Sequence, residues 1–234
     1  MCTVTFIPKN NKGFVLTSNR DEAPDRNTIE PQKHKTDGVQ LLFPKDEVAG
    51  GTWIGLSEKK RLICLLNGGF TAHERESEYR MSRGVIVTKL LTAEHVLETI
   101  LTYDFNGIEP FTIILILFED ETQLHELVWD GEKPHFTEKP LQPHIWSSSL
   151  LYTSEMKQLR ETWFSEFMFE TLKPTSEEIL KFHTEAGTGN PHSDLLMDRG
   201  FVKTKSITQI QKSEDDVHMY YQDLQTNQET VSVL

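Results

Sequence analysis

Cys2 is the residue of this sequence best suited to do chemistry, provided that Met1 is removed. An N-terminal cysteine holds a thiol nucleophile and, in its own α-amine, a general base. The reference pKa of that amine, about 7.7–8.0, suits proton transfer near neutral pH. Cysteine is also small enough at the second position to permit removal of the initiator methionine. The alternative is that Cys2 is an ordinary small hydrophobic residue on the inner face of the first strand.

The first two predicted strands position this cysteine. Cys2–Ile7 alternates with period two, Lys9–Gly13 has the composition of a turn, and Phe14–Ser18 predicts a second strand. In a hairpin centred near residue 11, the numbers of facing residues sum to about 22, so Cys2 lies opposite Arg20. We expect Asp21 to orient the α-amine, and Arg20 to lower the thiol pKa or to bind an acyl carboxylate.

The remaining residues with chemical potential carry weaker signals. Cys64 lies inside an apolar strand and is expected in the core. Asn67 ends the same strand ahead of two glycines, which favours a turn residue; its alternative role is an amide donor to an oxyanion. The nine histidines show no metal-ligand spacing, and no phosphate loop or dinucleotide motif occurs. We therefore expect neither a metal nor a cofactor.

Length and composition predict one soluble α/β or α+β domain over residues 1–234. A net charge of −12 argues against a surface that binds nucleic acid or anionic lipid. Only two cysteines occur and no signal peptide is recognisable, so we expect a cytoplasmic location. The longest apolar run, Phe111–Phe118, is far shorter than the ~20 residues of a membrane helix and predicts a buried strand. The sequence indicates no oligomeric state.

The order of predicted elements is strands, helices, strands, helices, strands, which favours antiparallel sheets layered against helices. Asp25–Gly38 is polar, contains two prolines and is predicted to be a long surface loop. Further strands are predicted at 50–56, 61–66, 111–118, 124–129, 201–210, 217–221 and 229–233, and helices at 82–91, 93–103, 154–170 and 175–184. The last helix begins with a capping box, Thr175 followed by Glu178, and a loop is expected over 185–198.

Several motifs together resemble the NRDE family, also called the transport and Golgi organisation protein 2 family. The resemblance runs in order from the N-terminus to about Phe118, and more faintly to Ile210. The matching stretches are Met1-Cys2-Thr3, Asn19-Arg20-Asp21-Glu22, Gly50-Gly51-Thr52-Trp53-Ile54-Gly55, Ser82-Arg83-Gly84 and Asn106-Gly107-Ile108-Glu109-Pro110-Phe111.

That family is similar in sequence pattern to the N-terminal nucleophile hydrolases, and in particular to bile-salt hydrolases and penicillin V acylases. The resemblance implies a four-layer αββα sandwich of two antiparallel sheets flanked by helices, and cleavage of a non-peptide amide bond. It implies a nucleophilic cysteine, an aspartate that holds its amine and an oxyanion asparagine. The corresponding catalytic residues are Cys2, Asp21 and Asn67, with Arg20 adjacent, and the residues assigned to substrate binding are Asn19, Trp53, Ser148 and Lys205.

Two positions depart from the pattern of the acylase branch. Ser18 stands where that branch has an arginine, and Ser148 stands where it has a second oxyanion asparagine. Loss of one such donor lowers the rate by about a hundredfold to a thousandfold. These departures leave two alternatives to an amidohydrolase: a non-catalytic protein that binds a lipid, acyl-thioester or haem-like ligand, and an interaction scaffold in which Cys2 is structural. An anionic substrate would need a local basic pocket, for which Arg20, Arg83 and Lys205 are available.

Overall fold

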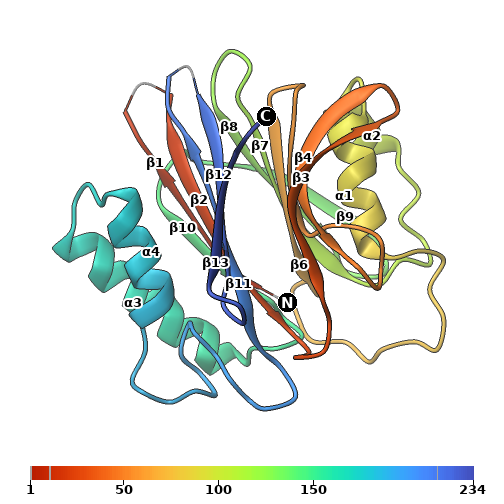
Figure 1. The fold of residues 1–234 in the computed structure, drawn as a ribbon. Coiled ribbons are helices and arrows are strands. Elements are labelled where there is room, and N and C mark those ends of the chain that lie inside the picture. Colours follow the sequence, from red (N-terminus) through yellow and green to blue (C-terminus); the bar gives the residue numbers. More distant parts are fainter. Residues whose placement is uncertain (1, 11, 215) are drawn as a thin grey trace. The chain divides into compact units, whose positions relative to one another are not determined.

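The computed structural model describes residues 2–10, 12–214 and 216–234, with the backbone alone for Cys2, and these residues form thirteen strands and four helices (Figure 1). The chain divides into two compact units. Unit 1 holds Met1–Arg26 with Gln142–Val233, and unit 2 holds Asn27–Leu141 with Leu234. Apart from Leu234, unit 2 is therefore one uninterrupted stretch of chain between the two segments of unit 1.

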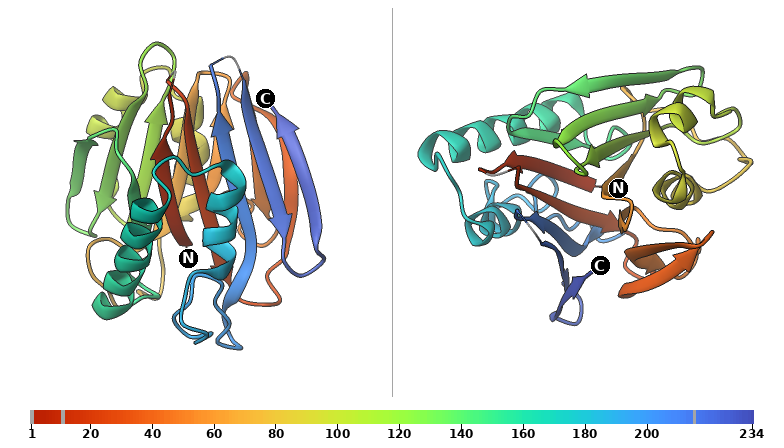
Figure 2. Two further views of the ribbon diagram at one scale, coloured as in Figure 1. Left: turned by 90° about the vertical axis from the view of Figure 1, so that its left-hand side faces the viewer. Right: turned by 90° about the horizontal axis from the view of Figure 1, so that it is seen from above.

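Unit 1 contains a six-stranded antiparallel sheet, called sheet A here. Helices α3 (Ser154–Glu170) and α4 (Ser176–Glu185) lie along one face of it, as the left view of Figure 2 shows. The N-cap residue Thr175 and Glu178 form the predicted capping box, which satisfies backbone N–H groups at the start of α4. The strands, in spatial order, are β10 (His144–Ser147), β1 (Cys2–Pro8), β2 (Phe14–Glu22), β11 (Lys203–Lys212), β12 (Val217–Asp223) and β13 (Gln228–Val233).

Apolar side chains hold the two helices against sheet A. Ile7 and Val15 project from the neighbouring strands β1 and β2, and they pack with Phe164 of α3 and with Ile179 and Phe182 of α4. The core of unit 1 on this side of the sheet is small, and polar side chains fill much of the remaining space. These polar side chains form the candidate site described below.

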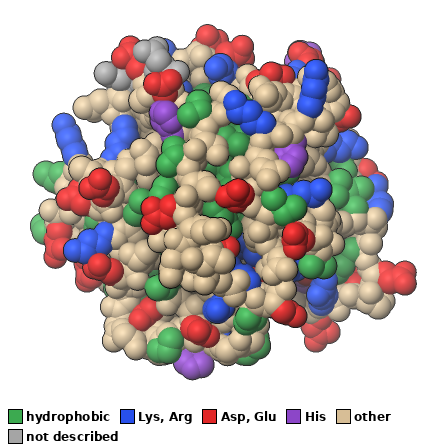
Figure 3. Space-filling view, viewed as in Figure 1, with side chains coloured by type: hydrophobic (Ala, Val, Ile, Leu, Met, Phe, Trp, Pro, Cys, Tyr) green, Lys and Arg blue, Asp and Glu red, His purple; other side chains and the backbone are tan. Residues whose placement is uncertain are grey.

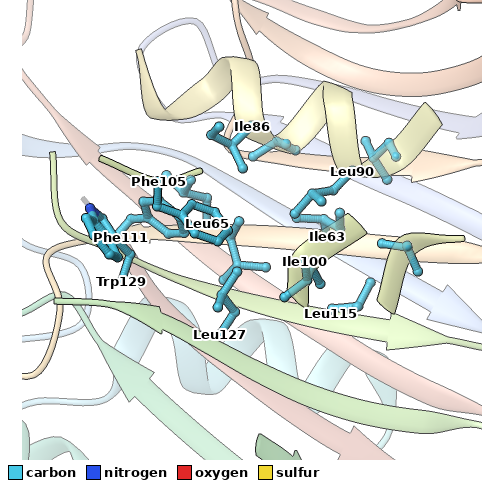
Figure 4. Close-up of a cluster of buried hydrophobic side chains, with 14 of the residues drawn as sticks. Ile63, Leu65, Ile86, Leu90, Ile100, Phe105, Phe111, Leu115, Leu127 and Trp129 are labelled. Carbon is cyan, nitrogen blue, oxygen red and sulfur yellow. The ribbon is translucent and has the colours of Figure 1, made fainter. Parts of the chain in front are cut away.

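Unit 2 contains a seven-stranded antiparallel sheet, called sheet B here, with helices α1 (Arg83–Thr92) and α2 (Val96–Thr102). Ile86 and Leu90 of α1 pack with Ile100 of α2 on strand residues such as Ile63 and Leu115, and Figure 4 shows this cluster. The strands, in spatial order, are β3 (Thr28–Thr36), β4 (Val39–Asp46), β5 (Ile54–Ser57), β6 (Arg61–Asn67), β7 (Phe111–Leu117), β8 (Gln123–Trp129) and β9 (Pro134–Lys139).

The predicted α+β class with two antiparallel sheets is confirmed. The predicted loop over Asp25–Gly38 is wrong, because Thr28–Thr36 forms the edge strand β3. Every residue of β3 except Pro31 is exposed or half-buried, and its pairing with β4 is irregular between Ile29 and Gln32, where Pro31 lies. Edge strands tolerate proline and charge, so this strand carries no hydrophobic alternation to indicate it.

Strands β4, β9 and β10 were not predicted, whereas the core position of Cys64 is confirmed by its complete burial in β6. The predicted segment 50–56 is strand only from Ile54 onward. No helix in the described ranges is both long and apolar enough to cross a membrane.

Candidate functional site

The β1–β2 hairpin has the register predicted from the sequence. Cys2 pairs with Arg20, and the pairs continue along the ladder to Pro8 and Phe14. Strand β2 also pairs with β11, so it lies between two neighbours, and every residue from Phe14 to Asp21 is buried. The segment that follows the predicted turn is therefore an inner strand, and it holds the Arg20-Asp21 pair at the same end of sheet A as Cys2.

Successive side chains of β2 point to opposite faces of sheet A. Asn19 and Asp21 point to the face covered by α3 and α4, because they hydrogen bond to His183 of α4 and to Tyr152 just before α3. Arg20 points to the other face. The two charged residues of the predicted site therefore act on opposite sides of the sheet.

The carboxylate of Asp21 is fully buried and held by two hydroxyl groups. The Tyr152 hydroxyl donates to Oδ2, and the Thr204 hydroxyl donates to Oδ1 over 2.7 Å. Burial raises the pKa of Asp21 above its ordinary value, and the Tyr152 hydrogen bond opposes that rise. The pKa of Tyr152 is raised well above its ordinary value by burial and by the Asp21 charge, so the shared proton stays on the phenol.

Arg160 of α3 is a buried cation next to this pair. Its guanidinium carbon lies 3.5 Å from the centre of the Tyr152 ring, a stacked cation–π contact. The same guanidinium donates to the Thr3 hydroxyl over 2.7 Å and to the backbone carbonyls of Ser193 and Asp194. Arg160 therefore ties α3 to β1 at the residue next to Cys2, and orients the tyrosine that holds Asp21.

Both polar atoms of the Asn19 side chain form hydrogen bonds with protein groups. Its amide nitrogen donates to the carbonyl oxygens of His183 and Leu195, over 3.0 and 2.9 Å, and its amide oxygen lies 2.7 Å from Nδ1 of His183. Nδ1 must carry the proton, so Nε2 accepts from the Thr5 hydroxyl. Burial and the charge of Arg160 lower the pKa of His183 to about 3, which keeps the imidazole neutral. We assign Asn19 to holding α4 on sheet A rather than to substrate contact.

An irregularity in the pairing of β2 with β11 places Lys205 beside Arg20. Thr204 pairs with Asp21 and Ser206 pairs with Arg20, so Lys205 is an extra residue that bulges from the strand. Lys205 and Arg20 are each 3% exposed, and Nζ of Lys205 donates to the carbonyl oxygen of Pro24. Burial, and then the Arg20 charge, lower the pKa of Lys205. The two predicted basic residues therefore stand close together.

The other predicted residues lie at separate places in the fold. Ser148 is buried directly after β10, and its carbonyl accepts from the Tyr152 amide. Asn67 and Trp53 belong to unit 2, where Asn67 is the last residue of β6 and Trp53 is buried just before β5. Asn67 and Trp53 are therefore not among the unit 1 residues that surround Asp21.

Arg83, the third basic residue considered for an anionic substrate, is engaged within unit 2. Its guanidinium lies 3.1 Å from the Glu109 carboxylate and donates to the Pro110 carbonyl. His73 also approaches Glu109, with Nε2 at 3.6 Å. Two of the motifs quoted above, around Arg83 and around Glu109, are therefore joined by a buried ion pair. This contact gives Arg83 a structural role in unit 2.

Tyr152, Thr204 and Arg160 were not predicted from the sequence as parts of the site. Each reaches Asp21 or its partner from a distant segment of the chain, and none belongs to a short motif. Within the described ranges, no group of three or more His, Cys, Asp or Glu side chains could hold a metal ion. Unit 1 therefore contains the buried carboxylate of Asp21, which accepts hydrogen bonds from the hydroxyl groups of Tyr152 and Thr204. Asp21 directly follows Arg20, the residue that pairs with Cys2.

Solved structures similar to this chain are N-terminal nucleophile hydrolases. A variant of conjugated bile acid hydrolase from Clostridium perfringens matches with a TM-score of 0.62 at 9% identity, over 99% of this chain and 92% of that one. Penicillin V acylase from Agrobacterium tumefaciens matches with a TM-score of 0.55 at 10% identity, over 100% and 86%. The Caenorhabditis elegans ortholog of N-acylethanolamine-hydrolyzing acid amidase matches with a TM-score of 0.59 at 10% identity, over 89% and 92%.

At these identities the similarity shows the fold, which is that of the N-terminal nucleophile hydrolases. No curated protein matches the chain by sequence. A model of the family described as Transport and Golgi organisation 2 matches residues 1–231. The resemblance drawn from the sequence motifs is thus confirmed over nearly the whole chain, and the protein belongs to the Transport and Golgi organisation 2 family.

Proposed function

We propose that this protein is a cysteine N-terminal nucleophile amidohydrolase that cleaves a non-peptide amide of a small acylated substrate. The observation that carries the proposal is the β1–β2 register, which pairs Cys2 with Arg20. The next residue of β2 is Asp21, whose carboxylate is buried. The N-terminal nucleophile hydrolase fold supports it, since enzymes with that fold include bile acid hydrolase and penicillin V acylase.

The proposed reaction has two steps. After removal of Met1, the Cys2 thiol loses its proton to the α-amine and attacks the amide carbonyl. The C–S bond forms, the C–N bond breaks, and the α-amine passes the proton to the leaving nitrogen. Water then attacks the thioester, which releases a carboxylic acid and restores the thiol. Asp21 orients the amine in this scheme, and Asn67 is the proposed donor to the oxyanion.

The intact mass of purified, folded protein tests the first requirement. We expect a mass that lacks Met1, because the α-amine of Cys2 must be free to act as the base. A soluble, fully folded protein that retains Met1 would overturn the mechanism. The same sample can be alkylated without denaturant, where Cys64, completely buried in β6, serves as the internal control.

Alkylation should add one adduct to the native wild type, none to Cys2→Ala, and two to unfolded wild type. No adduct on the native wild type would favour the alternative in which Cys2 is structural. A library of N-acyl amides then tests turnover: the wild type should hydrolyse at least one member, and Cys2→Ala should bind that member without hydrolysing it.

A non-catalytic carrier of a lipid, acyl-thioester or haem-like ligand is the second candidate. Ser148 favours it, because the acylase pattern has an oxyanion asparagine at that position and this chain does not. A carrier would bind a ligand and show no turnover with wild type or Cys2→Ala. For either function we propose a small-molecule ligand and a reducing, cytoplasmic location, supported by the net charge of −12 and the use of only two cysteines.

A further inference from the structure

Arg160 of α3 is a completely buried cation whose hydrogen bonds go to neutral groups. Its guanidinium donates to the Thr3 hydroxyl and to the backbone carbonyls of Ser193 and Asp194. Asp194 contributes its backbone oxygen, while its carboxylate accepts from the Thr188 amide. A charge inside a protein is costly unless an opposite charge compensates it. Arg160 therefore requires a negative group that lies nearby without touching it.

Asp21 is a buried carboxylate on the same side of sheet A. Tyr152 stands between the two charges, because its hydroxyl donates to Oδ2 of Asp21 and its ring centre lies 3.5 Å from the guanidinium carbon of Arg160. Electrostatic attraction falls only with the inverse of distance, so it acts across a single ring in an interior of low dielectric constant. Burial raises the pKa of Asp21, and the charge of Arg160 is among the influences that oppose the rise. All three side chains belong to unit 1.

The other groups around Asp21 and Tyr152 are neutral or lie further away. His183 of α4 stays neutral, because burial and then the charge of Arg160 lower its pKa to about 3. From β11, Asp21 accepts from a neutral hydroxyl, and its two neighbours in β2 point to the opposite face of sheet A. Arg199 lies 5.7 Å from the Tyr152 ring centre and is partly exposed. Arg160 is therefore well placed to compensate the charge of Asp21.

We propose that Arg160 is the counter-ion of Asp21 across the Tyr152 ring, and that this pairing keeps the Asp21 carboxylate charged beside Cys2. Arg160 acts on the site through Asp21 and is therefore a positioning residue for the N-terminal nucleophile. The link to Cys2 rests on the proposed function, in which Asp21 orients the α-amine. The charge pairing itself is a property of unit 1 and needs no substrate to be measured.

The first experiment follows the ionisation of Asp21 by NMR, in full-length protein labelled with ¹³C at the aspartate carboxyl carbons. The Asp21 signal is the one that disappears in Asp21→Asn. Arg160→Gln keeps a polar amide but no charge. It should raise the midpoint of the Asp21 titration by about one pH unit, because a positive charge that favours the carboxylate is lost. Arg160→Lys keeps the charge and should return the midpoint most of the way to the wild-type value.

Arg199→Gln is the matched control for the loss of a positive charge near the same ring. Arg199 is partly exposed and lies 5.7 Å from the ring centre, so solvent and salt screen its charge. Its substitution should leave the Asp21 midpoint unchanged. The proposal is overturned if Arg160→Gln leaves the midpoint unchanged. It is also overturned if Arg160→Lys or Arg199→Gln raises the midpoint as much as Arg160→Gln does.

A double-mutant cycle measured by urea unfolding at neutral pH provides an independent test. Arg160→Gln should lower the free energy of unfolding at least about twice as much in wild type as in Asp21→Asn, because only wild type then retains an uncompensated buried carboxylate. Additive losses would contradict the pairing. If Arg160→Gln alone fails to fold, Asp21→Asn combined with Arg160→Gln should still fold, since neither charge is then left unpaired. A combined variant that also fails to fold would overturn the proposal.

Turnover separates this inference from the proposed function. If wild type hydrolyses an N-acyl amide, Arg160→Gln should move the acidic limb of its kcat/KM profile to higher pH by as much as the Asp21 midpoint. An acidic limb that stays in place would overturn the link to the α-amine. If no amide is hydrolysed while the midpoint follows the proposal, the enzyme function fails and the charge pairing stands. If amides are hydrolysed and the midpoint does not respond to Arg160, the function stands and this inference fails.

Discussion

Tyr152 determines where the Asp21 carboxylate can point. Its hydroxyl donates to that carboxylate, and its ring is held in turn by the guanidinium of Arg160. A buried carboxylate loses much of its stabilisation when one of its donors is removed. The orientation of Asp21 is thus maintained in part by the hydroxyl group of Tyr152, whose ring is stacked on a cation.

Tyr152→Phe removes only the hydroxyl that reaches Asp21. We expect the free energy of unfolding to fall by about 1.5–3 kcal/mol, because a hydrogen bond to a buried carboxylate is lost. Urea unfolding measures this change. Tyr103→Phe is the control: among the described residues, the hydrogen-bond partner of the Tyr103 hydroxyl is the Met81 sulfur at 3.6 Å, so its loss should change stability little. Equal effects of the two substitutions would contradict the role given to Tyr152.

Asp21 should also leave a signature in the pH dependence of stability. Its pKa is raised in the folded chain, so the folded state holds the proton more tightly than the unfolded state does. As pH rises from the ordinary pKa of 3.8 through the raised folded value, the free energy of unfolding therefore falls, and it levels off above that value. Asp21→Asn cannot titrate, so this fall should be absent.

Unfolding curves for wild type and Asp21→Asn, collected from the lowered pKa of Asp130, about 2, up to neutrality, measure the difference. Asp130→Asn is a control for the opposite pH dependence of the free energy of unfolding. Hydrogen bonds, led by that from the Lys133 backbone, lower the pKa of Asp130 to about 2, so its contribution is lost as pH falls below 3.8. Parallel curves for wild type and Asp21→Asn throughout the range would refute the burial effect at Asp21.

Individual elements differ in how much local sequence reveals about them. Helix α3 matches its predicted bounds, and α4 starts at its predicted capping box, because periodicity and capping are local properties. The β1–β2 register was predictable because a short turn leaves little freedom in the pairing. Local sequence therefore sufficed to place Cys2 opposite Arg20.

The missed elements depend on distant contacts. Strands β3 and β9 end sheet B, and β10 ends sheet A, so each has one neighbouring strand and little apolar alternation. The partners of Asp21 could not be predicted for a similar reason. Thr204 is 183 positions away and Tyr152 is 131 positions away, and no spacing rule relates such positions.

Gly51 allows the Gly50–Gly55 motif of unit 2 to approach the Ser82–Gly84 motif closely. A Cβ at Gly51 would lie 2.9 Å from the backbone carbonyl carbon of Gly84, closer than real contacts allow. We expect Gly51→Ala to lower the free energy of unfolding by about 1–3 kcal/mol, because backbone has to move. Ser82→Ala is the control, since Ser82 is exposed and its side chain makes no cap bond. Thermal or urea unfolding without a difference between the two would contradict this close approach.

The charge of the whole molecule bears on what it can bind. Figure 3 shows acidic and basic side chains interspersed on the face in view, with no block of basic residues. With a net charge of −12 and an isoelectric point near 5.2, the protein should be retained by an anion exchanger near neutral pH and excluded by phosphocellulose. Its solubility should be lowest close to pH 5.2. Retention on phosphocellulose at physiological salt would contradict the exclusion of phosphate-rich partners.

The chain order of sheet A has a consequence for events during translation. Strand β2 needs β11 as its second neighbour, and β11 begins only at Lys203. At the usual rates of synthesis, about 5–20 residues per second, the ribosome needs about 10–40 s to make the intervening chain. Until then the start of the chain can form the β1–β2 hairpin, which β10 extends on the β1 side once His144–Ser147 has been made. An aminopeptidase that removes Met1 would therefore act on a nascent terminus, before Asp21 acquires Thr204 as its partner.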